Sequence, residues 1–166
     1  LSAARSFYLA TVSETGWPYL QHRGGPRGFV KVIDPHTPAF ADFRGNRQMI
    51  SVGNAAGNDR VALIVMDYAR RTRLKILGHL AVRDLEESDP LFPVLVDPGY
   101  RAHPQRAMVI TVEGFDWNCP QHIPVRIDAA DLPDGAIDLR QWHVLGVQPR
   151  HHDPGRRSRQ LPADHR

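Results

Sequence analysis

The chain has 166 residues, 42% of them hydrophobic and 23% charged, which suits one globular domain with a sizeable core. No apolar run approaches the roughly 18 residues that a membrane-spanning helix needs, so we expect no membrane partner. The single cysteine, Cys119, excludes an internal disulfide and fits a reducing cytoplasm.

The formal net charge of +3 comes from the end of the chain. Residues 150–166 carry five arginines and two aspartates, whereas acidic and basic residues balance over residues 1–149. A neutral body lacks the electrostatic footprint of a nucleic-acid-binding domain, so we expect no nucleic-acid partner. We predict one domain over residues 1–149, followed by a basic, irregular tail over residues 150–166.

Runs rich in β-branched and aromatic residues, bounded by turn-forming residues, predict a succession of strands. They cover residues 6–12, 19–22, 29–33, 37–41, 60–67, 74–82 and 106–115. Helices are predicted over residues 47–52 and 89–96, a basic hairpin tip over 68–73, and a bulge or close approach at Gly78. Short turns and few helices favour an antiparallel sheet closed into a barrel, because parallel strands need long crossovers. The predicted fold class is therefore mainly β, a β-barrel with a few helices.

Residues 40–48 form the segment that most suggests a binding site. A strand-like apolar run ends there, turn-forming residues follow, and a predicted helix begins at once. Asn46 is suited to cap that helix, whose free N–H groups and dipole attract an anion. Arg44 and Arg47 add guanidinium groups, which match the geometry of a phosphate. The pattern fits a phosphate site, and equally an ordinary strand-to-helix connection with solvated arginines.

Residues 23–29 form a second cluster, with three glycines and two arginines. The glycines would let a ligand approach the backbone closely, and Arg23 and Arg27 would add phosphate contacts. The cluster is neither a P-loop nor a dinucleotide-binding fingerprint. A wide bulge or loop between two strands would explain the glycines as well.

Residues 115–122 form a third cluster, just past a strand end. Trp117, two amides, a thiol and an imidazole would suit a pocket for a flat polar ligand. A structural loop with Trp117 packed on the core is the alternative. Cys119 and His122 are too few for a zinc site, and no second Cys/His pair lies at zinc spacing, so we predict no metal.

Together, these clusters resemble the pyridoxamine 5′-phosphate oxidase-like family of FMN-binding split β-barrels. The resemblance runs from about residue 6 to residue 126 and rests on the order and spacing of several segments. These are residues 7–12, 18–29, 40–48, 60–78 and 115–123. The Asp-Trp-Asn-Cys-Pro-Gln-His sequence of residues 116–122 is typical of one bacterial subgroup. The resemblance implies an antiparallel split β-barrel that forms a homodimer, with FMN at the subunit interface.

The resemblance also implies residue roles. The Asn46-Arg47-Gln48 triplet matches the family's Ser-Arg-Lys, whose cations hold the phosphate. Gln48 stands where a cation is usual, so Arg44 or Lys31 is expected to compensate. Asp42 matches a strand end near the flavin, and the region around Trp117 reaches the flavin of the partner subunit. The implied cofactor-binding residues are Arg23, Gly24, Gly25, Arg27, Gly28, Phe29, Asp42, Asn46, Arg47, Gln48, Arg73, Trp117, Asn118 and Gln121.

Several functions fit this family. The first is an FMN-dependent oxidoreductase with an unknown small-molecule substrate and NAD(P)H as a candidate electron donor. No catalytic residue is predicted, because hydride can pass directly to the flavin. The second is an FMN-binding carrier or sensor without turnover. The third is a split barrel that binds deazaflavin or haem, and haem would need an axial ligand such as His22, His79 or His122. The C-terminal substrate signature of true pyridoxamine-phosphate oxidases is not recognisable, so a vitamin B6 substrate is not implied.

Overall fold

The computed structural model describes residues 1–45, 49–117, 121–127 and 131–132. The chain divides into two units, Leu1–Arg126 and Ile127–Arg166, and every described helix and strand belongs to the first. The predicted domain boundary after residue 149 lies outside the described residues, so it stays a prediction.

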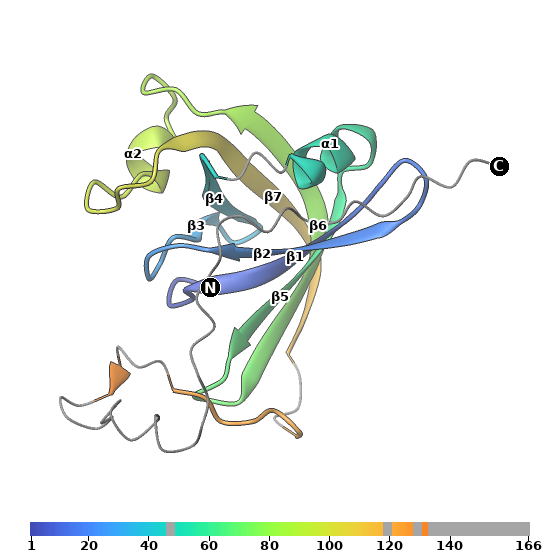
Figure 1. Cartoon of the computed structure of the whole chain (residues 1–166), viewed down its shortest axis with the longest axis vertical. Helices are drawn as coiled ribbons and strands as arrows, with labels where there is room; N and C mark the ends of the chain where they lie inside the picture. The colour runs from blue at the N-terminus through green and yellow to red at the C-terminus, as the bar shows by residue number, and fades with distance from the viewer. Residues whose placement is uncertain (46–48, 118–120, 128–130, 133–166) are drawn as a thin grey trace, which may run out of the picture. The chain divides into compact units, whose positions relative to one another are not determined.

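One antiparallel sheet forms the first unit (Figure 1). Its strands are β1 (Ser6–Val12), β2 (Pro18–Gly24), β3 (Lys31–Asp34), β4 (Thr37–Phe43), β5 (Arg60–Asp67), β6 (Thr72–Asp84) and β7 (Pro104–Trp117). The order across the sheet is β2-β1-β5-β6-β7-β4-β3. The consecutive strands β2 and β3 therefore lie at opposite edges, and the barrel is split between them. This architecture confirms the predicted split β-barrel.

The barrel interior is packed with apolar side chains because the strands alternate between inward and outward residues. In β1, Phe7 and Leu9 are buried while Tyr8 between them is exposed. Phe7 stacks on Phe29 with 5.7 Å between ring centroids and meets Phe40 edge to face at 5.0 Å. Such aromatic contacts stabilise a core beyond the area they bury.

Two helices cover parts of the sheet. The helix α1 (Ile50–Gly57) contacts β1, β2 and β6. The short helix α2 (Phe92–Leu95) packs Leu95 against Ala39, Ala41 and Ala107, on the face of β4 and β7 that points away from the interior. Both faces of β4 are therefore covered, and only its end near Asp42 meets a polar environment. Within the described residues, no helix has the length and hydropathy to cross a membrane.

Several elements differ from the sequence prediction in their bounds. The strand predicted from residue 29 begins at Lys31, because Phe29 turns into the core. The helix predicted over residues 47–52 is observed at Ile50–Gly57. The strands β6 and β7 each extend two residues beyond both predicted ends. The predicted irregularity at Gly78 is confirmed, since the β6–β7 register shifts between Leu77 and Gly78.

Candidate functional site

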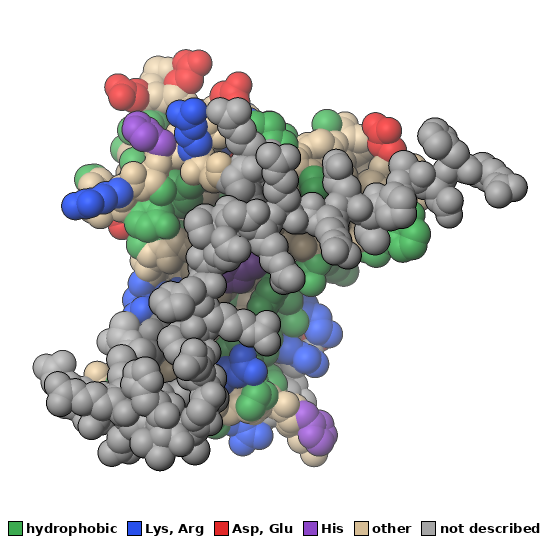
Figure 2. Space-filling view, in the orientation of Figure 1, with side chains coloured by type: hydrophobic (Ala, Val, Ile, Leu, Met, Phe, Trp, Pro, Cys, Tyr) green, Lys and Arg blue, Asp and Glu red, His purple; other side chains and the backbone are tan. Residues whose placement is uncertain are grey.

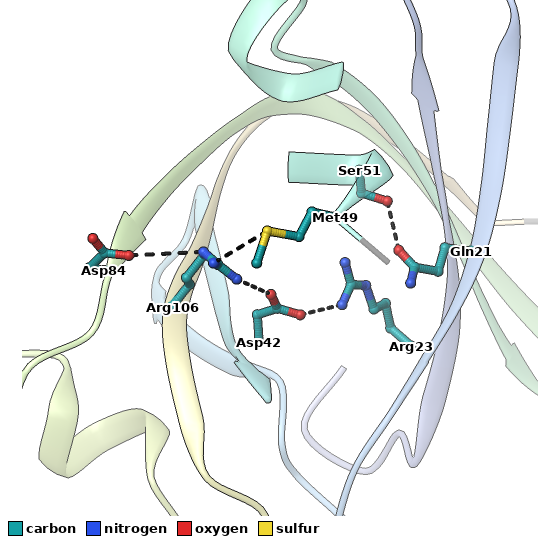
Figure 3. Close-up of polar contacts among 7 residues, drawn as sticks. All are labelled: Gln21, Arg23, Asp42, Met49, Ser51, Asp84 and Arg106. Atoms are coloured by element: carbon teal, nitrogen blue, oxygen red, sulfur yellow. Dashed lines mark hydrogen bonds and ion pairs between the residues drawn. The ribbon is translucent and has the colours of Figure 1, made fainter. Parts of the chain in front are cut away.

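Asp42 lies at the centre of a polar cluster at one end of the barrel (Figure 3). It is near the end of β4, on the same face as the core residue Phe40, and is only 8% exposed. Arg23 Nη1 donates to Asp42 Oδ1, and Arg106 Nη1 lies 3.4 Å from Asp42 Oδ2. Because β2 and β4 share no backbone ladder in the sheet order, the Arg23–Asp42 ion pair joins the two sides of the split barrel.

The cluster holds more positive charge than its buried carboxylate neutralises. The side chains of Arg23 and Arg106 are only 14% and 17% exposed, so both are largely shielded from water. Asp84 is 3.9 Å from Arg106 Nε, but its side chain is 87% exposed and contributes little at that distance. Arg23 Nε is buried with no hydrogen-bond partner among the described residues. Two guanidinium groups thus offer more donors than Asp42 can accept, which suits an anionic ligand.

The start of α1 lies beside this cluster. Its N-cap position is Met49, with no side-chain cap, and its first turn carries no acidic residue. Ser51 donates to Gln21 Oε1 at 2.7 Å, and Asn54 donates to Thr11 Oγ1 at 2.9 Å. These two polar bonds anchor the helix to β2 and β1, so its position follows from partners distant in sequence.

The prediction that Asn46 caps this helix is therefore wrong, because the helix begins after Met49. Ser51 and Asn54 fix the helix three residues later than the local pattern indicated, by bonding to the sheet. The triplet of Asn46, Arg47 and Gln48 itself lies outside the described residues. Met49, the described residue that follows it in the sequence, has its Sδ 3.7 Å from Arg106 Nη2.

The glycine-rich cluster has structural causes that the sequence did not reveal. Gly25 donates its backbone N–H to Arg5 O at 3.1 Å, and Gly28 donates to Ala4 O at 3.3 Å. A Cβ on Gly25 would lie 2.7 Å from the Phe29 ring, and Gly28 has a φ of +79°. These amides are therefore already bonded to the chain. Gly24 and Arg27 are exposed at the surface, whereas the Phe29 side chain is buried in the core.

The third cluster lies at the other end of β7. Trp117 ends this strand and is 60% exposed. Roughly 35 Å of extended strand separates it from Arg106, which sits near the start. Trp117 pairs with Leu74, whereas Arg73 pairs with Met66 on the opposite face of the sheet. Within one chain, the structure thus brings Arg23 and Asp42 together but leaves Trp117 and Arg73 far from them.

Residues 121–126, which follow β7 in the sequence, contact the β5–β6 turn. Ile123 is buried, and its carbonyl oxygen accepts from Arg71 Nε at 3.2 Å. Arg126 lies over the Tyr68 ring at 4.8 Å. Gln121 is exposed at the start of this segment, and Asn118 lies outside the described residues.

Histidine and carboxylate side chains form no metal site in the described part of the chain. His79 lies between two carboxylates, with Nδ1 2.9 Å from Asp59 Oδ1 and Nε2 3.4 Å from Glu113 Oε1. These hydrogen bonds, led by the one to Asp59, raise the pKa of His79 above its ordinary value. His22 packs edge to face on Tyr8, and His122 is exposed with a φ of +64°.

Arg106 is the functional candidate that sequence reasoning missed. It meets Asp42 only because β7 pairs with β4, a long-range pairing that no local motif records. The sequence showed only that Arg106 is the first residue of a predicted strand. An arginine at that position does not by itself indicate a binding site. The Ser51–Gln21 hydrogen bond was not predicted either, because it joins residues 30 positions apart in the sequence.

The family comparison agrees with the fold. A model described as pyridoxamine 5′-phosphate oxidase matches residues 1–116. A HupZ variant from Group A Streptococcus is similar in structure, with a TM-score of 0.56 and 14% identity over 71% of this chain and 93% of that one. A search of curated proteins found no match.

Two further solved structures share the fold. A candidate pyridoxamine 5′-phosphate oxidase from Lactobacillus delbrueckii matches with a TM-score of 0.50 and 20% identity, over 68% of this chain and 84% of that one. An F420 reductase matches with a TM-score of 0.50 and 17% identity, over 70% of this chain and 92% of that one. At these identities the structural matches show the fold alone. Because the family model covers most of the chain, including the Asp42 cluster, the protein belongs to the pyridoxamine 5′-phosphate oxidase family.

Proposed function

We propose that this protein binds FMN and is an FMN-dependent oxidoreductase acting on a small molecule. The observation that carries the proposal is the Asp42 cluster, in which two largely buried arginines share one carboxylate beside the uncapped start of α1. Such a concentration of guanidinium donors suits the phosphate group of FMN. When bound, FMN would supply the redox chemistry, and the protein would hold the phosphate and orient the ring.

We further propose that the site is completed by a second copy of the chain. Trp117 offers an exposed aromatic surface on which a flat ring could stack, but it lies at the far end of β7 from Arg106. One FMN cannot reach both ends of this strand within one chain. A homodimer in which Trp117 of one subunit approaches the Asp42 cluster of the other resolves this separation.

The outer face of the sheet supports a dimer. Cross-strand neighbours Leu20, Ala10, Ala62 and Leu77 form a row across β2, β1, β5 and β6. Leu20 and Leu77 at its ends are 63% and 57% exposed. Figure 2 shows hydrophobic side chains reaching the surface beside Lys and Arg on the face it presents. Ala10 and Ala62 between them are half-buried. A contiguous apolar patch on an outer face is typical of a surface that another protein covers, and we propose that a second copy covers this one.

Two finer assignments accompany this proposal. The sequence of residues 116–122 supports membership of the subgroup that carries Asp-Trp-Asn-Cys-Pro-Gln-His. The single cysteine supports a cytoplasmic location.

The first experiment is to identify the ligand of the purified protein. We expect a yellow protein that releases FMN on denaturation, detected by mass spectrometry. Bleaching of the flavin absorbance by NAD(P)H, with recovery in air, would support an oxidoreductase, whereas FMN that no donor reduces would support a carrier. A Soret band would favour haem, although both ring nitrogens of His79 already face carboxylates. Colourless protein that binds no added FMN would contradict the proposal.

A substitution at Arg47 tests the proposed phosphate site directly. We expect Arg47→Ala to weaken FMN binding by about 1.5–3 kcal/mol, because a charge-assisted hydrogen bond to phosphate is lost. Fluorescence titration of FMN measures the change. Superimposable titration curves for the wild type and the variant would exclude Arg47 from the site.

A further inference from the structure

The family resemblance implies two cations at the phosphate, but the third residue of the Asn46-Arg47-Gln48 triplet is uncharged. We therefore expect a cation in addition to Arg47. Sequence reasoning offered Lys31 and Arg44. Lys31 pairs with Ala39, which alternation places on the face of β4 opposite to Asp42. Arg44 is exposed beyond the end of β4, and its backbone N–H donates to His103 O at 2.8 Å. Neither residue has the shielded setting of the Asp42 cluster.

We propose that Arg106 supplies this second cation and binds the phosphate of FMN, with Asp42 acting as its positioning residue. The inference rests on the proposed FMN site and adds a residue that lies outside the recognised segments. Arg106 belongs to β7 and approaches the start of α1 from the side opposite to Arg23 (Figure 3).

The hydrogen bonds of Arg106 orient its guanidinium group and leave room for a stronger acceptor. Its Nη1 faces Asp42 Oδ2 at 3.4 Å, which directs the guanidinium toward α1. Its Nη2 faces Met49 Sδ at 3.7 Å. A thioether sulfur is a weak acceptor, so a phosphate oxygen arriving there would replace a poor partner with a strong one.

The burial of Arg106 also favours a binding role. The Arg106 side chain is 17% exposed, and Asp42 holds it in one orientation. Its conformational freedom is therefore largely lost before any ligand binds, which reduces the entropy cost of binding. Low exposure also limits screening by water and salt, so a charge here acts more strongly than one on the surface.

Paired titrations with FMN and riboflavin test the inference, because riboflavin has the same ring and ribityl chain without the phosphate. We expect Arg106→Gln to weaken FMN binding roughly tenfold to a hundredfold. Riboflavin affinity should stay within about twofold of the wild type, since a lost phosphate contact costs it nothing. The salt dependence of FMN binding should also decrease, because one phosphate-facing charge is gone.

Two further variants separate a lost phosphate contact from a loss of structure. Arg83→Gln is the matched control: Arg83 also pairs with an aspartate, Asp89, but lies on the opposite face of β6 from Asp84. It should leave both affinities unchanged. If Arg106→Gln fails to fold by circular dichroism, Arg106→Lys keeps the charge while losing the bidentate fork. We expect that variant to weaken FMN binding and spare riboflavin.

The outcomes separate this inference from the proposed function. Wild-type protein that binds neither ligand would overturn both. Wild-type protein that binds FMN, together with an Arg106→Gln variant of equal affinity, would overturn only the role of Arg106. Equal losses for FMN and riboflavin would also overturn it, because they would assign Arg106 a purely structural role.

Discussion

Asp42 shows how one residue can serve both the fold and the site. Its carboxylate joins Arg23 on β2 to Arg106 on β7, across the split where the backbone ladder is interrupted. Removing one partner of a largely buried ion pair usually destabilises a protein, because the other charge is left without compensation. The same geometry aims two guanidinium groups toward the start of α1. The proposed function therefore makes ligand binding depend on the same three side chains as stability.

Glycines at two positions give a matched prediction of stability. A Cβ on Gly78 would lie 2.3 Å from Thr111 O, a backbone atom that cannot move aside, whereas a Cβ on Gly53 would meet nothing within 4 Å. We expect Gly78→Ala to lower the free energy of unfolding by about 1–3 kcal/mol or more. Gly53→Ala should raise it by up to about 1 kcal/mol, because alanine favours a helix interior. Urea unfolding of both variants measures the difference, and equal effects would contradict this account.

At the scale of elements, local composition predicted most strands but not what anchors them. Residues 6–12 and 60–67 were predicted with their observed ends, because apolar β-branched runs there stop at strong turn residues. The helix α1 was misplaced because Ser51 and Asn54 bond to side chains of the sheet. Sequence alone cannot show such partners.

The residues of the candidate site were likewise predicted only in part. Asp42 was predicted as a cofactor-binding residue from its place at a strand end and from the family resemblance, and that role stays a prediction. Arg106, 64 positions further along the chain, required the β4–β7 register to become visible. The glycines of residues 24–28 suggested a ligand, yet Gly25 and Gly28 have packing and backbone reasons within the chain itself.

The β5–β6–β7 region carries a pH-dependent interaction. His79 on β6 bonds to Asp59 just before β5 and to Glu113 on β7, and both contacts favour the protonated ring. Because the folded-state pKa of His79 is raised, its stabilisation is fully present below the unfolded value of about 6.5. The stabilisation is lost as the pH rises through the higher, folded-state pKa. We expect the melting temperature to fall across this window more steeply in the wild type than in His79→Gln. Parallel melting profiles would exclude the contribution.

At the scale of the whole molecule, the length of β7 separates the two halves of the proposed site. The Asp42 cluster lies near its start and Trp117 at its end. The proposed function therefore makes FMN binding a property of the dimer rather than of the single chain. The oligomeric state should therefore respond to FMN, since a ligand that contacts both subunits stabilises their association.

Complementation between two defective chains tests this arrangement. Arg47→Ala damages the phosphate half and Trp117→Ala damages the ring-stacking half, so each homodimer should bind FMN weakly. Random mixing of the two chains makes about half of the dimers mixed, and each mixed dimer has one site with both halves intact. About one quarter of all sites should then regain wild-type affinity, measured by FMN titration after co-refolding. If each chain formed its site alone, every site would keep one defect and mixing would restore nothing. The Arg47→Ala chain mixed with itself is the control, and recovery there would show that the defect was not in the site.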